Sequence, residues 1–358
     1  MEIIMYTSFR PGKTWYDTEG KRIQAHGGSI IYANDTFYWY GENKENITGT
    51  ATGERCEYWH HGVRCYSSKD LYNWQDEGMI VPESDDGENP FFPAHIMDRP
   101  HILYNEKTQK FVLWAKTSKK GRSFETAKFS LCVGDSLHSL KYVGDIDSKP
   151  HFAGDFDLFV HENKAYAIFE YPHTEMIVRE LNEEYTGFAE KWSTHLPLKN
   201  PPFVREAPAY FKRNGRSFIL TSGTTGYYPN STIAYDITDL HGEWNCLGLT
   251  CKNDVTKTSF HTQFSSVFKH PTIPDLYIAI GDRWLTDLTE DLPDMDDVFF
   301  DRYDPRGKKQ FNWEDLKHFS DENTSEADYV WLPVMFDENG NPYIEWRRVW
   351  RIDEFKKQ

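Results

Sequence analysis

The residue with the clearest chemical potential in this chain is Glu206. It stands in the run Arg-Glu-Ala-Pro at 205–208, where an extended segment begins, and its neighbours on the C-terminal side are uncharged. A carboxyl group in such surroundings can have a raised pKa and can act as a proton donor. The alternative is an ordinary loop carboxylate that is solvated or paired with Arg205. The residues that accompany Glu206 in the fold decide between these two interpretations.

Three other polar residues stand where predicted strands begin. Asp98 precedes Arg-Pro at 99–100, Asp155 opens the segment 155–160, and Gln263 is the third residue of the segment 261–268. Carboxylates and an amide from well-separated segments can form one catalytic cluster only if the fold brings the strand starts together. The elements that carry these residues are therefore the next question.

The chain predicts an all-β fold. Extended segments alternate with polar turns, and no apolar pattern of helical period is sustained for more than a turn or two. The acidic run 287–297 is interpreted as a surface loop. Strand pairs recur every 50 to 70 residues or so, which is the spacing of propeller blades. Five such units are predicted, beginning within 28–42, 99–115, 155–170, 204–220 and 261–282.

A single five-bladed β-propeller spanning residues 1–358 is the favoured architecture, with no separate second domain. A two-domain β-sandwich is the alternative, but no Pro-rich, Ser-rich or Gly-rich linker divides the chain. In a propeller the innermost strands enter from one face, so Glu206 is expected to meet Asp98, Asp155 and Gln263 there. Polar groups that face each other across a cleft are what glycosidic bond hydrolysis requires.

The amino-acid composition favours some classes of binding partner and disfavours others. Aromatic residues make up 16% of the chain, with 12 Trp, 21 Tyr and 24 Phe, and such side chains suit both pleated sheets and stacking on sugar rings. The formal charge of -16 disfavours nucleic acid and anionic membrane surfaces. Five scattered cysteines favour reduced thiols over disulfides or a zinc site. Because the first residues lack the features of a signal peptide, we expect a cytoplasmic protein.

Several motifs resemble those of glycoside hydrolase family 43, the five-bladed propeller glycosidases, and in particular its exo-β-1,3-galactanase branch. They occur in the expected order along nearly the whole chain. The matching runs are WYDTEG at 15–20, QAHGG at 24–28, YWYGE at 38–42, DRP at 98–100, REAP at 205–208, SGTTGYYPN at 222–230 and WLP at 331–333.

The resemblance implies inverting hydrolysis and assigns roles to the cluster. Glu206 matches the general acid, and Asp155 resembles the carboxylate that raises the pKa of that acid, with Asp157 as the lesser alternative. The usual family base, an Asp near 24–28, is missing here. The galactanase branch also lacks it and is thought to use a glutamine, which Gln263 matches. Asp98 stands where that branch carries Glu, so it either binds a sugar hydroxyl or marks a different substrate.

The resemblance also implies sugar-binding residues, each with a structural alternative. Glu42 resembles a sugar-contacting carboxylate but could simply pair with Lys44. The other candidates are His26, which could instead be a core histidine, Trp114 and Tyr227 as stacking platforms, and Thr225 as a subsite hydroxyl. No cofactor is expected to be required. His261 is a candidate for holding a central ion or water, and a structural Ca²⁺ in the central channel is the corresponding metal hypothesis.

These observations predict an exo-acting, inverting glycosidase for β-1,3-galactan-type oligosaccharides. An α-L-arabinofuranosidase or β-xylosidase of the same family is the first alternative. A sugar-binding propeller without catalysis is the second, because the missing early Asp and the Asp at position 98 are what it would show. The oligomeric state is left open.

Overall fold

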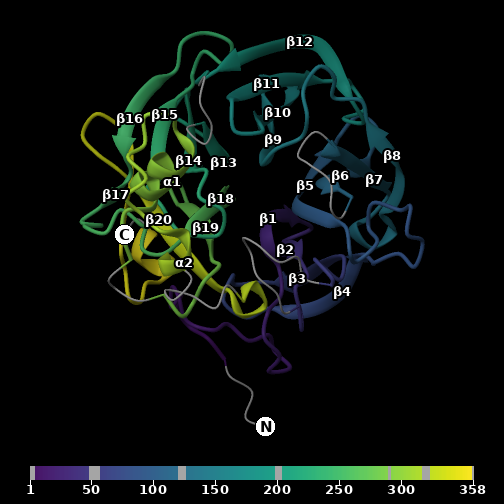
Figure 1. The fold of residues 1–358 in the computed structure, drawn as a ribbon. Coiled ribbons are helices and arrows are strands. Elements are labelled where there is room, and N and C mark those ends of the chain that lie inside the picture. The colour runs from purple at the N-terminus through teal and green to yellow at the C-terminus, as the bar shows by residue number, and fades with distance from the viewer. Residues whose placement is uncertain are drawn as a thin grey trace.

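The computed structural model describes residues 5–47, 57–119, 126–197, 204–288, 292–316 and 323–356. Five sheets, antiparallel except for one parallel pair in the last, stand in a ring around a central axis (Figure 1). The predicted all-β, five-bladed propeller is therefore confirmed. None of the helices within these ranges is long and apolar enough to cross a membrane.

Each blade runs outward from the axis in chain order, except the last. Blade I holds β1 (His26–Ala33), β2 (Thr36–Glu42), β3 (Val63–Ser68) and β4 (Gln75–Val81), and blade II holds β5 (Ile96–Asn105), β6 (Lys110–Ser118), β7 (Lys128–Gly134) and β8 (Lys141–Ile146). Blade III holds β9 (Phe156–His161), β10 (Lys164–Tyr171), β11 (Glu175–Leu181) and β12 (Phe188–His195). Blade IV holds β13 (Arg205–Arg213), β14 (Arg216–Gly223), β15 (Ile233–Asp236) and β16 (Asn245–Leu249).

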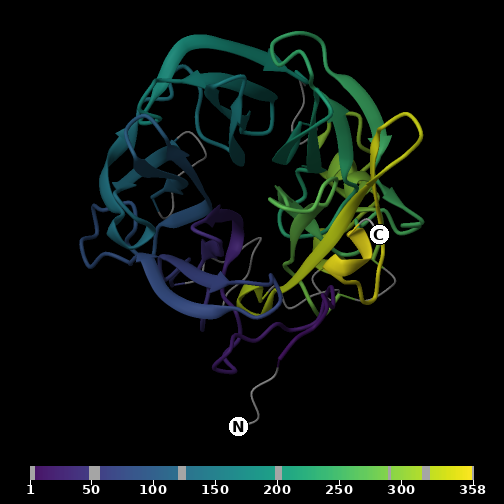
Figure 2. The same cartoon turned by 180° about the vertical axis from the view of Figure 1, so that it is seen from behind.

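Blade V is assembled from two parts of the chain. Its strands β18 (Gln263–Lys269), β19 (Tyr277–Arg283), β20 (Asp328–Phe336) and β21 (Pro342–Glu345) follow one another, but the outermost strand β17 (Cys251–Lys252) precedes them and pairs with β21 in parallel. The view from behind shows β20 and β21 closing the ring beside the N-terminal segment (Figure 2).

The hairpin turns follow the sequence chemistry. In blade I, Asn34 and Asp35 connect β1 to β2 with φ values of 49° and 55°. Two successive residues with positive φ are typical of the turn whose twist matches an antiparallel hairpin, and Asn and Asp tolerate that conformation better than other residues with a side chain. The turn sets the register in which Ala33 lies opposite Thr36.

The ring closes between blades I and V through aromatic packing rather than a shared strand. Phe9 forms an isolated β-bridge with Trp350, and their rings stack with centroids 4.2 Å apart. Trp331 lies 4.6 Å from Trp39 and 5.1 Å from Trp15 between ring centroids. These large aromatic side chains fill the space where the first and last blades meet.

The prediction of a surface loop over 287–297 is wrong at its end. Helix α1 (Met295–Tyr303) begins inside the acidic run, where the side chain of Asp294 accepts a hydrogen bond from the backbone N–H of Asp296. Acidic residues at a helix N-terminus are favourable because they satisfy free N–H groups and oppose the helix dipole. Together with α2 (Trp313–Leu316) this helix lies in the connection from β19 to β20, and residues 289–291 fall outside the described ranges.

The innermost strands contact one another in ring order, from β1 through β5, β9, β13 and β18 back to β1. Each begins at the same face of the propeller. The predicted site residues stand at or directly before these strand starts, which is the arrangement that a common site needs.

Candidate active site

Bulges aim the first side chains of four innermost strands. The pairing register shifts just after His26 in β1, after Asp98 in β5, after Glu206 in β13 and after Phe264 in β18. Arg99 and Ala207, directly within two of these bulges, have φ values of 54° and 46°. Such φ values are uncommon for residues with a Cβ, and bulges of this kind redirect side chains beside functional sites.

Glu206 lies at the centre of the cluster. Its exposed fraction is 8%, and its Oε1 accepts a hydrogen bond of 3.1 Å from Nε2 of Gln263. Burial raises the pKa of Glu206 well above its ordinary value, and the negative charges of Asp155 and Glu170 raise it further against the opposing cations Arg99 and Lys116. A carboxyl group in this environment keeps its proton at a pH at which an exposed glutamate has lost it.

Asp155 has the opposite electrostatic character. One carboxylate oxygen lies 2.9 Å from the guanidinium of Arg99, and the other lies 2.9 Å from Nζ of Lys116. Burial disfavours its charge, but these two cations outweigh burial and hold the pKa of Asp155 far below its usual range. The site therefore pairs a carboxyl group whose pKa is raised with one whose pKa is lowered, which is how acid and electrostatic roles are divided in glycosidic bond hydrolysis.

Asp98, in blade II, contacts the same Lys116 that pairs with Asp155 at the start of blade III. Its Oδ2 lies 3.2 Å from Nζ of Lys116, and its Oδ1 accepts a hydrogen bond of 2.8 Å from Nε1 of Trp59. Lys116 thus joins Asp98 and Asp155. Both carboxylate oxygens of Asp98 are held, and the side chain forms part of the wall of the site.

Glu42 is paired with Lys44, as the structural alternative in the sequence anticipated. Its Oε2 lies 3.0 Å from Nζ of Lys44, and its Oε1 accepts the backbone N–H of Arg99 at 3.1 Å. Both side chains of the ion pair are 2% exposed. Burial raises the pKa of Glu42 to about 7 although Lys44 opposes this, so its charge is only weakly favoured near neutral pH.

Gln263 lies beside Glu206 rather than at a distance from it. Its Nε2 also donates to Oγ of Ser222 at 2.8 Å, and its Oε1 accepts hydrogen bonds from Arg99 and, at 3.2 Å, from Nε1 of Trp284. All hydrogen-bonding positions of the amide are occupied by protein groups. In this arrangement Gln263 orients Glu206, and it has no lone pair left for a water molecule.

Aromatic side chains from three blades or their loops line the site. Tyr227 has its ring centroid 5.1 Å from that of Trp284 and 6.5 Å from that of Trp59. Nζ of Lys44 lies 5.0 Å from the ring centroid of Trp59. Tyr227 and Trp284 line a small pocket together with Gln263 and Ser222. The structure therefore places the predicted stacking residue Tyr227 at the cluster.

Three predicted sugar-binding residues have no free group for a sugar. Trp114 is fully buried inside blade II, where its ring packs on Phe129 and its Nε1 donates to a backbone carbonyl, so it is not a stacking platform. His26 is fully buried, and its ring nitrogens contact Asp282 at 3.1 Å and Gln24 at 3.0 Å. The hydroxyl of Thr225 donates to a backbone carbonyl in its own loop at 2.6 Å.

The potential metal-binding group differs from the one considered from sequence. Among the described residues, ligand atoms of Glu170, His173 and Glu206 lie within 4.8 Å of one another. His261 is not in this group, although it lines the pocket beside Tyr227. Two carboxylates and one imidazole beside two cations are a poor match for Ca²⁺, which takes six or more oxygen ligands. The central Ca²⁺ stays a prediction.

Sequence reasoning missed the basic side chains of the site. Arg99 was visible in the motif Asp-Arg-Pro, and a buried Arg beside Asp could have been expected to pair with it. Lys116 directly follows a predicted apolar strand, and its position opposite Asp98 in the register of β5 and β6 was the available signal. Glu170 lies one residue before the end of β10, and Trp284 directly follows β19, at the face where the innermost strands begin.

Fold and site together define a class: a propeller in which a buried Glu with a raised pKa accompanies an Asp with a lowered pKa, as in carbohydrate-hydrolysing enzymes. The family model "Glycosyl hydrolases family 43" matches residues 22–247, more than half of the chain. The chain belongs to this family. Among curated proteins, none matches the chain.

Solved structures with the same fold support this placement. One described as a family 43 β-1,3-galactosidase is 26% identical, with a TM-score of 0.77, and the match covers 98% of this chain and 64% of that one. A second β-1,3-galactosidase, with galactodeoxynojirimycin, is 25% identical, with a TM-score of 0.77 and coverage of 96% and 100%. An exo-β-1,3-galactanase from Phanerochaete chrysosporium is 20% identical, with a TM-score of 0.75 and coverage of 97% and 68%. This chain thus spans less than two thirds of the first of these proteins.

Proposed function

We propose that this glycosidase removes terminal sugars from β-1,3-linked galactosides by inversion, with Glu206 as the general acid. The observation that carries the proposal is the buried carboxyl of Glu206, whose pKa is raised by burial and by Asp155 and Glu170. Similarity to two β-1,3-galactosidases at 25% and 26% identity supports the choice of sugar.

The acid step follows from the electrostatics of the cluster. Protonated Glu206 donates its proton to the glycosidic oxygen as the bond to the anomeric carbon breaks. Asp155, charged and held by Arg99 and Lys116, makes ionisation of Glu206 unfavourable before substrate binds. It also stabilises the positive charge that develops on the sugar ring in the transition state. Its pKa, far below the usual range, keeps it charged throughout.

The water step requires a rearrangement. An inverting pair stands roughly 6.5 to 9.5 Å apart so that water and the sugar fit between them, whereas Gln263 and Glu206 are in hydrogen-bond contact at 3.1 Å. In the proposed mechanism the incoming sugar replaces this hydrogen bond, and the released side chain of Gln263, in its imidic acid form, orients the attacking water on the far side of the ring. Its Nε2 accepts a proton from that water, and the proton on its oxygen passes to solvent. Asp98 holds Lys116 and Trp59 in place beside that water.

The central test compares wild-type protein with Glu206→Gln on β-1,3-galactobiose, an aryl arabinofuranoside and an aryl xyloside. We expect release from galactobiose by the wild type and a loss of about 10²- to 10⁴-fold in kcat for the variant, the range for one general acid. Proton NMR of the first product should show the α-anomer. Equal release by both proteins on every substrate would reject the acid, and release from the arabinofuranoside alone would reject the sugar.

The role of Gln263 is tested separately. We expect Gln263→Ala to lower kcat, while Asp98→Asn and His26→Ala retain more activity. His26→Ala also needs a melting curve, because its ring is fully buried. If Gln263→Ala keeps wild-type turnover and Asp98→Asn loses it, the water is activated by Asp98 instead.

A further inference from the structure

A second cavity lies at the end of the propeller opposite the candidate active site. It has a volume of about 540 Å³ and lies between blades I and V. Its walls include the turn after β1 and the turn after β18, whereas Gln263 stands at the start of β18. Seven residues of strand separate the two ends, which places the cavity roughly 20 Å from Gln263. None of the residues assigned to the glycosidase site lines it.

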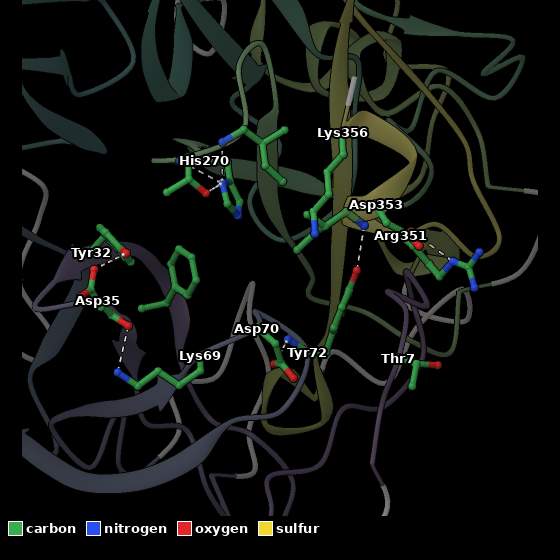
Figure 3. Close-up of a pocket in the computed structure, with 14 residues that line it drawn as sticks. Thr7, Tyr32, Asp35, Lys69, Asp70, Tyr72, His270, Arg351, Asp353 and Lys356 are labelled. Atoms are coloured by element: carbon green, nitrogen blue, oxygen red, sulfur yellow. Dashed lines mark hydrogen bonds and ion pairs between the residues drawn. The ribbon is translucent and has the colours of Figure 1, made fainter. Parts of the chain in front are cut away.

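The cavity is lined by one ring N–H that no described residue uses as a hydrogen-bond donor. His270 is 8% exposed, and its Nδ1 accepts the backbone N–H groups of Thr272 at 3.3 Å and Ile273 at 3.2 Å. Burial, helped by the charge of Lys356, holds the pKa of His270 at about 4, so the ring is neutral and its proton is on Nε2. Within the described part of the chain this Nε2 has no hydrogen-bond partner. Figure 3 shows His270 and Lys356 on one side of the cavity, with Asp35 and Lys69 across from them.

The other groups that line the cavity supply both donors and acceptors. Nζ of Lys69 donates to the backbone oxygen of Asp35 at 2.9 Å and to the hydroxyl of Thr36, which leaves one N–H. The ammonium of Lys356 has no ion pair or hydrogen bond in the described residues. Only Oδ1 of Asp35 is used, by the hydroxyl of Tyr32 at 3.0 Å. Tyr72 accepts the backbone N–H of Ile352 at 2.7 Å, and its own hydroxyl hydrogen is still available.

Charge and shape select the ligand class. Three carboxylates and three cationic side chains line the cavity, so their formal charges cancel and the lining favours neither an anion nor a cation. The residues are Asp35, Asp70, Asp353, Lys69, Arg351 and Lys356. Half-buried Tyr32 and Tyr72 add aromatic surface. A ligand that donates and accepts hydrogen bonds at many positions and carries apolar C–H faces meets these conditions, and a volume of this size holds one or two sugar rings.

We propose that this cavity is a second, non-catalytic carbohydrate site that binds a neutral sugar unit. The choice of a galactoside as its ligand rests on the proposed function, but the site itself does not. His270 Nε2, the free N–H of Lys69 and the ammonium of Lys356 donate to sugar hydroxyls, and Asp35 accepts from them. Such a site keeps an oligosaccharide chain near the enzyme after its end leaves the active site.

The position of the cavity predicts a second effect. Its walls come from both ends of the chain, and the hydrogen bond from Ile352 to Tyr72 joins the C-terminal segment to blade I. A sugar that contacts both Asp35 in blade I and His270 in blade V links the blades where the ring closes. Binding to the folded form alone raises the melting temperature as ligand concentration rises above its Kd.

The test observes His270 directly in the Glu206→Gln variant, which leaves the sugar intact. The protein is labelled with ¹⁵N-histidine and titrated with galactose, β-1,3-galactobiose and, as a charged comparison, glucuronate. The His270 ring signal is assigned by its loss in His270→Asn, since the Asn oxygen can replace Nδ1 as the acceptor in the turn. We expect a saturable shift with the neutral sugars, and a Kd at least fivefold weaker in Lys356→Met.

Matched controls separate this site from the active site. Lys141→Met removes an exposed lysine of β8 and should leave the titration unchanged. In an otherwise wild-type protein, His270→Asn and Lys356→Met should keep the kcat for galactobiose. A linear or absent shift for all three sugars, or a preference for glucuronate, overturns the proposal. A saturable shift in a protein that does not release galactose would refute the proposed substrate and leave this site standing.

Discussion

The candidate active site and the aromatic closure between blades I and V are both buried, yet they are built from opposite materials. The site pairs Asp155 with Arg99 and Lys116 at 2.9 Å, and the charges of all three act on Glu206. The closure places Trp331 among other indole rings at 0 to 1% exposure. Burying charges costs free energy that only partners recover, whereas burying indoles stabilises outright. The indoles of the closure therefore stabilise the fold, whereas the charged residues of the site depend on the fold to hold their partners in place.

The largest expected effect on stability comes from removing an indole at the closure. Trp331→Ala should lower the free energy of unfolding by about 3 to 5 kcal/mol, the usual cost of truncating a large buried aromatic residue. Chemical denaturation of the two proteins measures this. Trp192→Ala, which removes a ring that is 44% exposed, is the control and should cost much less. An equal loss in both variants would mean that the closure is not a special source of stability.

A medium effect is expected for two aromatic residues that were both predicted to bind sugar, of which only Tyr227 lies at the site. Tyr227→Ala should raise KM for galactobiose about tenfold, because its ring lines the site, with little change in the unfolding free energy. Trp114→Phe should leave KM unchanged and lower stability, because its ring and its Nε1 are used inside blade II. Steady-state kinetics and melting curves for both variants measure the contrast. A rise in KM for Trp114→Phe would restore its predicted role in binding.

A smaller effect is a shift in the pH dependence of the reaction. The general acid must be protonated, so activity falls as pH rises through the pKa of Glu206. The negative charge of Asp155 raises that pKa, while Arg99 and Lys116 lower it. In Asp155→Asn the raising charge is gone and the cations are unpaired, so the fall in kcat/KM should begin at a lower pH. Asp135→Asn, at an exposed position, is the control. A fall that begins at a higher pH would contradict the electrostatic role of Asp155.

Much of the fold could be predicted from the sequence because its signals are local. The alternation of apolar and polar residues in strands, and turns such as Asn34-Asp35, depend on only a few neighbouring residues. These local patterns were enough to predict where each of the five blades lies in the sequence. The bulges after Asp98 and Glu206 have no such local signal, because Arg99 and Ala207 adopt positive φ only under tertiary constraint. Helix α1 was missed for a related reason, since its acidic N-terminus resembles a solvated loop.

The candidate site also has features that could be predicted from the sequence and features that could not. Glu206, Asp155, Asp98 and Gln263 could be predicted to meet because strand starts converge in a propeller. Their hydrogen bonds could not, since the contact between Gln263 and Glu206 depends on side-chain directions across blades IV and V. Lys116 escaped notice because its importance comes from pairing with Asp98 and Asp155, each from a different part of the chain.

The bulges have a consequence for how this enzyme can change. At each bulge, the direction of the first side chain does not depend on how the rest of the strand pairs with its neighbour. After Glu206, for example, regular pairing resumes only at Ala209. Substitutions or loop insertions in the outer strands can therefore accumulate without turning the reacting groups. New substrate preferences can then arise by remodelling the rim of the propeller, while the chemistry at its axis is inherited unchanged.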